Sequence, residues 1–149
     1  MQQVTFPVRV LKFLGIERLI ITIASGPRFP DMSKPYDAAL RARALDAARK
    51  HGIRAFEGVY SALQGPNLET PAEYTMLRRL GSDCTGMSSV PEVLVARHMD
   101  LPVLLLSMVT NVSFPPDVIR ETSVEDVIAT ARAAEPNLSL LVREVVKND

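Results

Sequence analysis

The sequence has little of several features that would assign it to a specialised class of protein. It contains a single cysteine, Cys84, which excludes an internal disulfide and indicates a reducing compartment. Its 17 basic and 17 acidic residues cancel, so no overall charge favours nucleic acid or an anionic membrane. No apolar run reaches the roughly 18–20 residues of a membrane span, and the first residues lack a signal-peptide pattern. We therefore expect a cytoplasmic protein without nucleic-acid or membrane partners.

Signals for several catalytic and cofactor-binding motifs are also missing. The sequence has no G-x-G-x-x-G, G-x-x-x-x-G-K-[ST] or G-x-S-x-G pattern. His51, His98 and Cys84 do not have the spacing of metal ligands. Dinucleotide binding, a P-loop, a serine hydrolase elbow and a metal site are therefore not predicted.

The apolar residues that are present predict an α/β fold. The 149 residues fit one domain, 1–149. Val8, Leu11 and Leu14 before Gly15 predict a short helix, and the residues after it predict strands at 18–25, 53–63 and 103–111. Residues 82–89 are expected to form a short strand or turn.

Four further helices are expected. The first has Ser33 as N-cap and ends at Gly52, and the next two cover 70–80 and 90–99. The last runs from Thr122 or Ser123 to Val146, with a kink or break at Pro136. Apolar strands that alternate with helices indicate a mostly parallel twisted sheet with helices on both faces.

Helix capping explains several polar residues without any catalytic role. Thr70-Pro71-Ala72-Glu73 fits a capping box, in which the Thr70 hydroxyl and the Glu73 carboxylate bond each other's backbone amides. The segments 89–92 and 123–126 follow the same pattern, a serine with an acid three residues later. Glu73 is therefore predicted to be structural.

Capping leaves four residues at strand-to-helix junctions, where open α/β sheets bind their ligands. Glu69 is either a solvated acid at a helix start or a ligand-binding group. Ser88 is either a turn residue or part of an anion site. Met87 is either a core residue or a ligand contact, and Asn111 is either a turn residue or a bidentate hydrogen-bonding group.

Four stretches together resemble a known family. "VTFPVRVLKFLGIERLIIT", "GVYSALQGPNLETPAEYTMLRRLGSD", "GMSSVPEVLVARH" and "LSMVTN" are similar to the trimeric purine nucleoside phosphorylases that prefer 6-oxopurine nucleosides. The resemblance covers most of residues 4–111. It implies a nucleoside phosphorylase fold and a reaction in which phosphate, as co-substrate, converts a purine (deoxy)nucleoside to the free base and a pentose 1-phosphate. It also implies a homotrimer without a metal or organic cofactor.

The resemblance assigns roles to the residues that capping leaves unexplained. Asn111 would hydrogen-bond the purine near N7 and O6, and Glu69 would accept from N1–H of a 6-oxopurine. Met87 would lie under the ribose. Ser88 and the backbone amide of Ala24 would contact phosphate.

The sequence also departs from the family pattern at several positions. Phe29 matches the aromatic residue that a neighbouring subunit lends to the sugar pocket, but Leu68 replaces a phenylalanine that packs on the base. Val124 replaces a histidine that touches the ribose 5′-hydroxyl, and Ile23 replaces an asparagine. The family has a long segment before "VTFPVRV", with further phosphate-binding residues, and another where this chain has Ser25-Gly26-Pro27.

These departures lead to two expectations about activity. In the first, the chain is a shortened phosphorylase whose activity is weak or absent because its phosphate site is incomplete. In the second, it is a non-catalytic purine-binding protein or a structural, oligomerising scaffold derived from the same fold.

Overall fold

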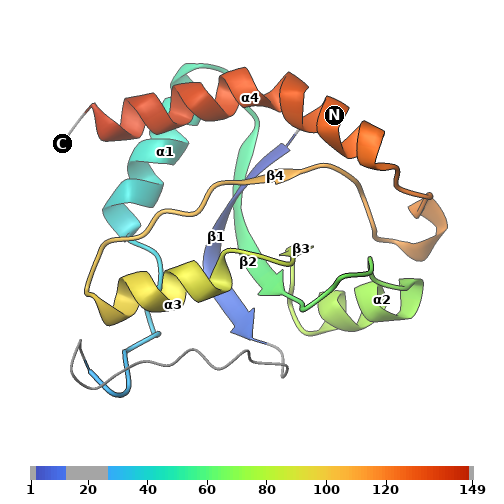
Figure 1. The fold of residues 1–149 in the computed structure, drawn as a ribbon. Coiled ribbons are helices and arrows are strands. Elements are labelled where there is room, and N and C mark those ends of the chain that lie inside the picture. Colours follow the sequence, from blue (N-terminus) through green and yellow to red (C-terminus); the bar gives the residue numbers. More distant parts are fainter. Residues whose placement is uncertain (1–2, 13–26, 148–149) are drawn as a thin grey trace.

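The computed structural model describes the backbone of residues 3–12 and all of residues 27–147. Figure 1 shows the elements in their order along the chain. They are β1 (Gln3–Lys12), α1 (Ala38–Lys50), β2 (Ala55–Ala62), α2 (Pro71–Arg79), β3 (Cys84–Gly86), α3 (Val90–His98), β4 (Ser107–Val109), the short 3-10 helix η2 (Pro116–Val118) and α4 (Val124–Val146).

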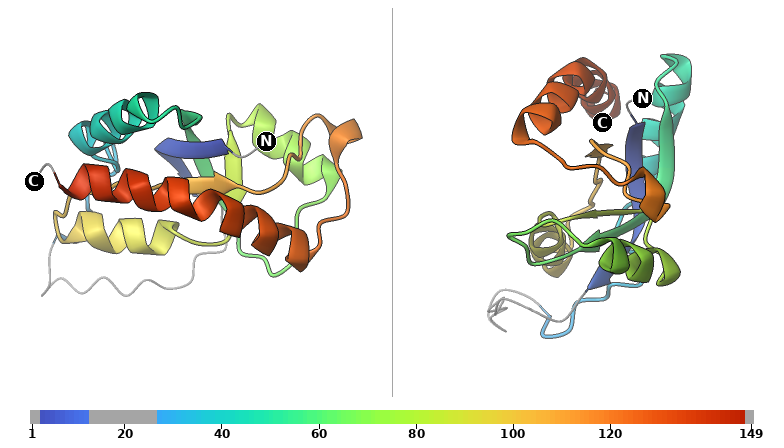
Figure 2. Two further views of the ribbon diagram at one scale, coloured as in Figure 1. Left: turned by 90° about the horizontal axis from the view of Figure 1, so that it is seen from above. Right: turned by 90° about the vertical axis from the view of Figure 1, so that its right-hand side faces the viewer.

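The four described strands form one sheet in the order β3-β2-β1-β4. β1 pairs parallel with β2, and β2 pairs parallel with β3, while β4 is antiparallel to β1. In Figure 2 (left), α1 and α2 lie on one side of β1 and β2, and α3 and α4 lie on the other. The predicted α/β fold, with a mostly parallel sheet and helices on both faces, is confirmed.

The first strand occupies part of a segment for which the sequence predicted a helix. Residues 8–12 belong to β1, so the helix predicted from Val8 is wrong there. β-Branched and aromatic residues are frequent in this segment and favour extended backbone, and pairing with β2 on one side and β4 on the other stabilises it. The register shifts between Pro7 and Arg9, as expected because proline cannot donate to a ladder. The strand predicted at 18–25 lies outside the described residues.

Two other boundaries differ from the prediction. The strand expected over 103–111 is reduced to Ser107–Val109, because only these residues pair with β1. Helix α1 begins after Asp37, whose carboxylate accepts from Leu40 N at 2.8 Å, and not after Ser33. Ser33 instead donates its amide and its hydroxyl to Asp31, which holds an exposed turn ahead of the helix. A carboxylate that faces the first-turn amides therefore sets the true helix start.

The main described core lies between α1 and α4. Ala44, Ala47 and Ala48 of α1 pack against Leu141 and Val145 of α4, and leucines of the segment before β4 pack against this cluster. The small alanine side chains allow the two helices to approach closely. None of the helices within the described ranges is long and apolar enough to cross a membrane.

Candidate functional site

Two loops at the carboxyl ends of β2 and β3 lie against each other. Gly65, in the loop after β2, has φ +66°, a left-handed conformation that favours glycine. A Cβ atom at this position would lie 2.4 Å from Met87 Sδ, in the loop after β3. Glycine, with its positive φ and no Cβ, therefore favours direct packing of the loop that leads to Glu69 against Met87.

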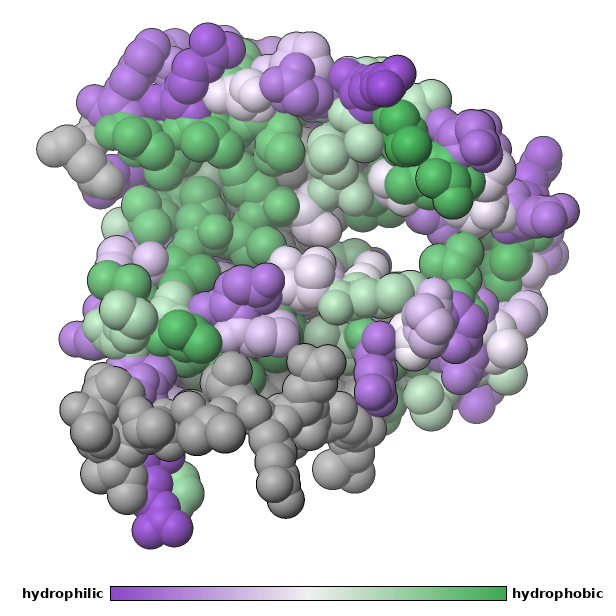
Figure 3. Space-filling model, viewed as in Figure 1, coloured by the Kyte–Doolittle hydropathy of each residue, from purple (hydrophilic) through white to green (hydrophobic). Residues whose placement is uncertain are grey.

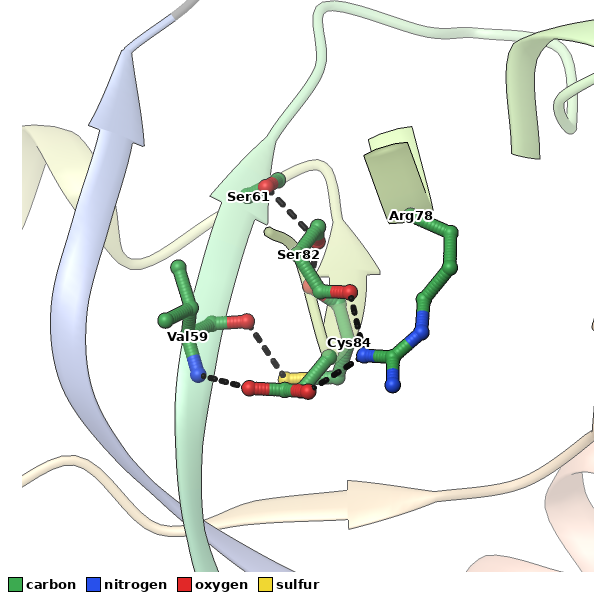
Figure 4. Close-up of polar contacts among 6 residues, drawn as sticks. Val59, Ser61, Arg78, Ser82 and Cys84 are labelled. Carbon is green, nitrogen blue, oxygen red and sulfur yellow. Dashed lines mark hydrogen bonds and ion pairs between the residues drawn. The ribbon is translucent and has the colours of Figure 1, made fainter. Parts of the chain in front are cut away.

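A hydrogen-bond network holds β3 beside β2 (Figure 4). The buried Ser61 hydroxyl donates to Ser82 Oγ at 2.7 Å, and Ser82 Oγ donates to the Cys84 carbonyl at 3.0 Å. Arg78 of α2 donates to Asp83 at 2.7 Å and to the Ser82 carbonyl at 3.3 Å. The network links α2 to β2 and β3, the strands that lead into the two loops, and so it fixes the positions of the loops relative to each other.

The turn between β3 and α3 has an unusual backbone. Tyr60 of β2 donates its hydroxyl to the Ser88 carbonyl at 3.0 Å, while the Ser88 residue itself is exposed. Ser89 has φ +72° and makes no side-chain hydrogen bond to the helix. The predicted cap by Ser89 is therefore wrong, because this backbone conformation does not aim the hydroxyl at the first-turn amides. Those amides of α3 are thus not capped by the serine next to them.

The start of α2 confirms the predicted capping box and separates the two glutamates near it. Thr70 Oγ1 accepts from the Glu73 amide, and the Glu73 carboxylate accepts from Thr70 N at 2.7 Å and from its hydroxyl at 2.8 Å. These bonds to the Thr70 backbone and hydroxyl lower the pKa of Glu73. Glu69 directly precedes the cap and is half-buried. Glu73 is structural, and Glu69 takes no part in the capping box.

Asn111 is held at both ends of its amide. The Thr110 hydroxyl donates to Asn111 Oδ1 at 2.9 Å, and Asn111 Nδ2 donates to Ser113 Oγ at 3.3 Å. An amide has two donor hydrogens and two acceptor lone pairs. One donor and one acceptor thus remain available on an exposed, oriented side chain, as bidentate recognition requires.

Tyr74 of α2 lies near the Glu69 and Asn111 loops. Its side chain is buried in the first part of α2, and burial is the main reason that its pKa is raised. Ser113 and Glu69 have smaller effects on the pKa of Tyr74. Tyr74 and Ser113 were not predicted as site residues, since neither follows a capping pattern and nothing in the chain order brings residue 74 next to residue 113.

The space-filling view has an opening in the same region. Figure 3, drawn in the orientation of Figure 1, shows a gap between the segment from β4 to η2 and the region of β3 and α2. These elements carry the Asn111, Met87 and Glu69 loops. Segments that follow β2, β3 and β4 thus lie near one opening in this view.

Other predicted site residues do not join this group. Phe29 is 83% exposed, with Arg28 at 5.3 Å from its ring centroid, and Leu68 and Val124 are 52% and 69% exposed. None of the three is buried against the loops described above. Ala24 and Ile23 lie outside the described residues.

The described side chains do not suggest metal or thiol chemistry. Within residues 27–147, no three His, Cys, Asp or Glu side chains come together in a group suited to a metal ion. Burial, with a smaller effect of Asp83, raises the pKa of Cys84 to about 11. The thiol is therefore protonated at neutral pH, and a nucleophilic role is not supported.

Comparison with known proteins agrees with this geometry. The profile of the Phosphorylase superfamily matches residues 2–147. The chain belongs to this superfamily. Purine nucleoside phosphorylase 1 of Geobacillus stearothermophilus is 37% identical, in an alignment that covers 98% of this chain and 66% of that protein. Purine nucleoside phosphorylase of Mus musculus is 34% identical, with coverage of 95% and 63%.

Solved structures give the same result. The crystal structure of a schistosoma purine nucleoside phosphorylase in complex with hypoxanthine superposes with a TM-score of 0.89 at 32% identity, covering 97% of this chain and 54% of that chain. The corresponding complex of the Schistosoma mansoni enzyme with inosine also gives 0.89 at 32% identity. The resemblance to purine nucleoside phosphorylases and the predicted fold are thus confirmed.

The chain is shorter than these relatives. It spans between 54% and 66% of the length of the proteins described above. The alignment with the Geobacillus protein extends over 182 positions, more than the 149 residues of this chain. The relatives therefore have residues within the aligned region that this chain does not have, in agreement with an internal gap.

Proposed function

We propose that this chain recognises a 6-oxopurine base through Glu69 and Asn111 and serves the phosphorolysis of purine (deoxy)nucleosides. The observation that carries the proposal is the superposition of this chain on purine nucleoside phosphorylase structures in complex with hypoxanthine and with inosine, together with the orientation of the Asn111 amide by Thr110 and Ser113. Glu69 offers a half-buried carboxylate acceptor, and Asn111 offers one donor and one acceptor. This set complements N1–H, O6 and N7 of hypoxanthine or guanine.

The proposed chemistry makes use of this arrangement. When the bond between ribose and purine breaks, negative charge develops on the base and the sugar becomes oxocarbenium-like. A hydrogen-bond donor already oriented at the base stabilises this charge without reorganisation at the moment of reaction. Asn111 is held by Thr110 and Ser113 and fits this role. Met87, against Gly65, would lie beneath the ribose.

We further propose that phosphate is the co-substrate and binds near the β3–α3 turn. Ser88 is exposed there, and Ser89 leaves the first-turn amides of α3 without a side-chain cap. Such amides attract oxyanions. In this proposal the enzyme is cytoplasmic, needs no metal or organic cofactor and assembles as a homotrimer. The high exposure of Phe29 supports a role in the sugar pocket of a neighbouring copy.

The direct test is release of hypoxanthine from inosine in the presence of phosphate. We expect measurable turnover that falls at least tenfold in Glu69→Gln and in Asn111→Ala, because each removes one base contact. Glu135→Gln, an exposed acid on α4, is the control and should behave as the parent. Equal rates for all four proteins would contradict the assigned roles.

A second measurement distinguishes the enzyme from a non-catalytic purine-binding protein. The observation that favours a binding protein is the internal gap relative to the Geobacillus protein, whose aligned region has residues that this chain does not have. Calorimetric titration with hypoxanthine should show binding that weakens in Glu69→Gln. Binding without turnover would support the binding protein, and absence of both would contradict purine recognition altogether.

A further inference from the structure

We infer that Tyr60 is a positioning residue of the β3–α3 turn, whose hydroxyl holds the Ser88 carbonyl and thereby directs the backbone amide of Ser89 toward phosphate. The inference rests on the proposed function, in which phosphate binds at this turn. It adds a backbone donor beside the exposed Ser88, and it assigns a task to a tyrosine that is otherwise only a buried part of β2.

The Ser88 carbonyl accepts two hydrogen bonds. The Tyr60 hydroxyl donates to it at 3.0 Å, and the Val90 amide donates to it at 2.9 Å. Ser89, between the two ends of the second bond, has φ +72° and ψ −35°. This combination is a γ-turn whose central residue lies in the left-handed region. Such a backbone is strained for serine, so it persists only where surrounding contacts hold it, and the bond from Tyr60 is a contact of this kind.

The direction of the Ser88 carbonyl sets the direction of the Ser89 amide. In a trans peptide the C=O and N–H groups point in opposite directions, and neither cis peptide bond of the described residues lies in this turn. The carbonyl points to Tyr60, which is only 4% exposed, so the amide points away from this buried side chain. Among residues 27–147, no acceptor binds the Ser89 amide. It is therefore available to donate to an oxyanion at the start of α3.

The sheet brings the Tyr60 hydroxyl to this turn. Tyr60 pairs with Cys84 of β3, and Gly86, two positions further along β3, lies on the same face as Cys84. A Cβ atom at Gly86 would lie 2.4 Å from the Tyr60 hydroxyl oxygen. The glycine thus leaves room for the phenol to extend along β3 and reach the residue that follows Met87.

The test is calorimetric titration of the full chain with inorganic phosphate and, separately, with hypoxanthine. Tyr60→Phe removes only the hydroxyl and should weaken phosphate binding about fivefold, while hypoxanthine binding should change by less than about twofold. A general loss of structure would weaken both, so the contrast between the ligands identifies a positioning role. Tyr36→Phe is the control, because Tyr36 is equally buried and its hydroxyl has no hydrogen-bond partner among the described residues. It should leave both affinities as in the parent.

Gly86→Ala provides an independent variant that displaces the Tyr60 hydroxyl without removing it. It should weaken phosphate binding to a similar extent, and the double variant with Tyr60→Phe should be little worse than either single one, because both act on the same bond. Additive losses would overturn the inference. So would parent phosphate affinity in Tyr60→Phe, an equal loss for phosphate and hypoxanthine, or an equal phosphate loss in Tyr36→Phe.

The two ligands also separate this inference from the proposed function. A parent that binds phosphate in a Tyr60-dependent way, but neither binds hypoxanthine nor releases it from inosine, would contradict the proposed function and support the inference. A parent that binds hypoxanthine but not phosphate would overturn the inference and leave purine recognition intact.

Discussion

Residues of one type in this protein have different tasks, which depend on the atoms around each side chain. Glu69 and Glu73 are four positions apart, yet the carboxylate of Glu73 accepts from the amide and hydroxyl of Thr70, while Glu69 takes no part in this capping box. Among the serines, Ser61 is fully buried in the strand network and Ser88 is exposed at a helix start. Residue identity alone does not separate these cases.

Cys84 allows a prediction at this scale because it is the only cysteine in the chain. Burial raises the pKa of its thiol to about 11, so the reactive thiolate is scarce below that pH in the folded protein. We expect alkylation by iodoacetamide to be slow at pH 8 and to accelerate only above about pH 10. In urea, where the thiol has an ordinary pKa of about 8.5, labelling at pH 8 should be fast. Rapid labelling of the folded chain at pH 8 would contradict the assigned environment.

At the scale of the element, two helices with the same sequence pattern begin in different ways. α2 and α3 both have a hydroxyl residue, a proline in the first turn and an acid at the third position. Thr70 has an extended backbone and caps α2, whereas Ser89 has φ +72° and does not cap α3. The difference arises because the loop before α3 turns sharply after β3, while the loop before α2 enters the helix in an extended conformation.

This difference predicts unequal effects of the same kind of substitution. Thr70→Ala removes a hydroxyl that makes cap bonds and should lower the free energy of unfolding by about 1 kcal/mol. Ser89→Ala removes a hydroxyl that makes no cap bond and should change it by less than about 0.5 kcal/mol. Urea unfolding followed by circular dichroism measures both. A larger loss in Ser89→Ala than in Thr70→Ala would refute the observed caps.

At the scale of the whole molecule, contacts between distant parts of the chain join the fold. α1 packs against α4, the first and last described helices, and β1 lies between β2 and β4. Figure 3 shows apolar side chains gathered between α4 and α3, over the segment that leads to β4. Packing of the C-terminal helix is therefore coupled to the strand that precedes the Asn111 loop.

Leu141 tests this coupling because it is fully buried between α1 and α4. Leu141→Ala should lower the free energy of unfolding by about 2–5 kcal/mol, since it leaves a cavity in the main described core. Val142→Ala is the control, because the neighbouring side chain is 46% exposed, and it should cost less than about 0.5 kcal/mol. Thermal or urea unfolding gives both values. Equal costs for the two substitutions would show that α4 is not packed as described.

The fold class and most helices could be predicted from the sequence because their signals are local. Hydrophobic spacing indicated α2, α3 and α4, and the predicted caps at Thr70 and Ser123 are confirmed for α2 and α4. The helix predicted from Val8 was wrong because pairing with β2 and β4, which no local pattern shows, stabilises a strand there. The strand before Asn111 is shorter than predicted. An apolar run can pack in the core whether or not its backbone hydrogen-bonds to a neighbouring strand.

By itself the sequence determined the neutral charge balance, the α/β alternation, the resemblance to purine nucleoside phosphorylases and the presence of Glu69 and Asn111 at strand ends. Only the tertiary structure decided which segments lie next to each other, such as α2 and η2, because residues far apart in the chain meet through packing. It also decided which serine caps a helix, since that depends on backbone dihedral angles. Contacts between segments distant in the chain arise from packing, and packing is a property of the folded molecule.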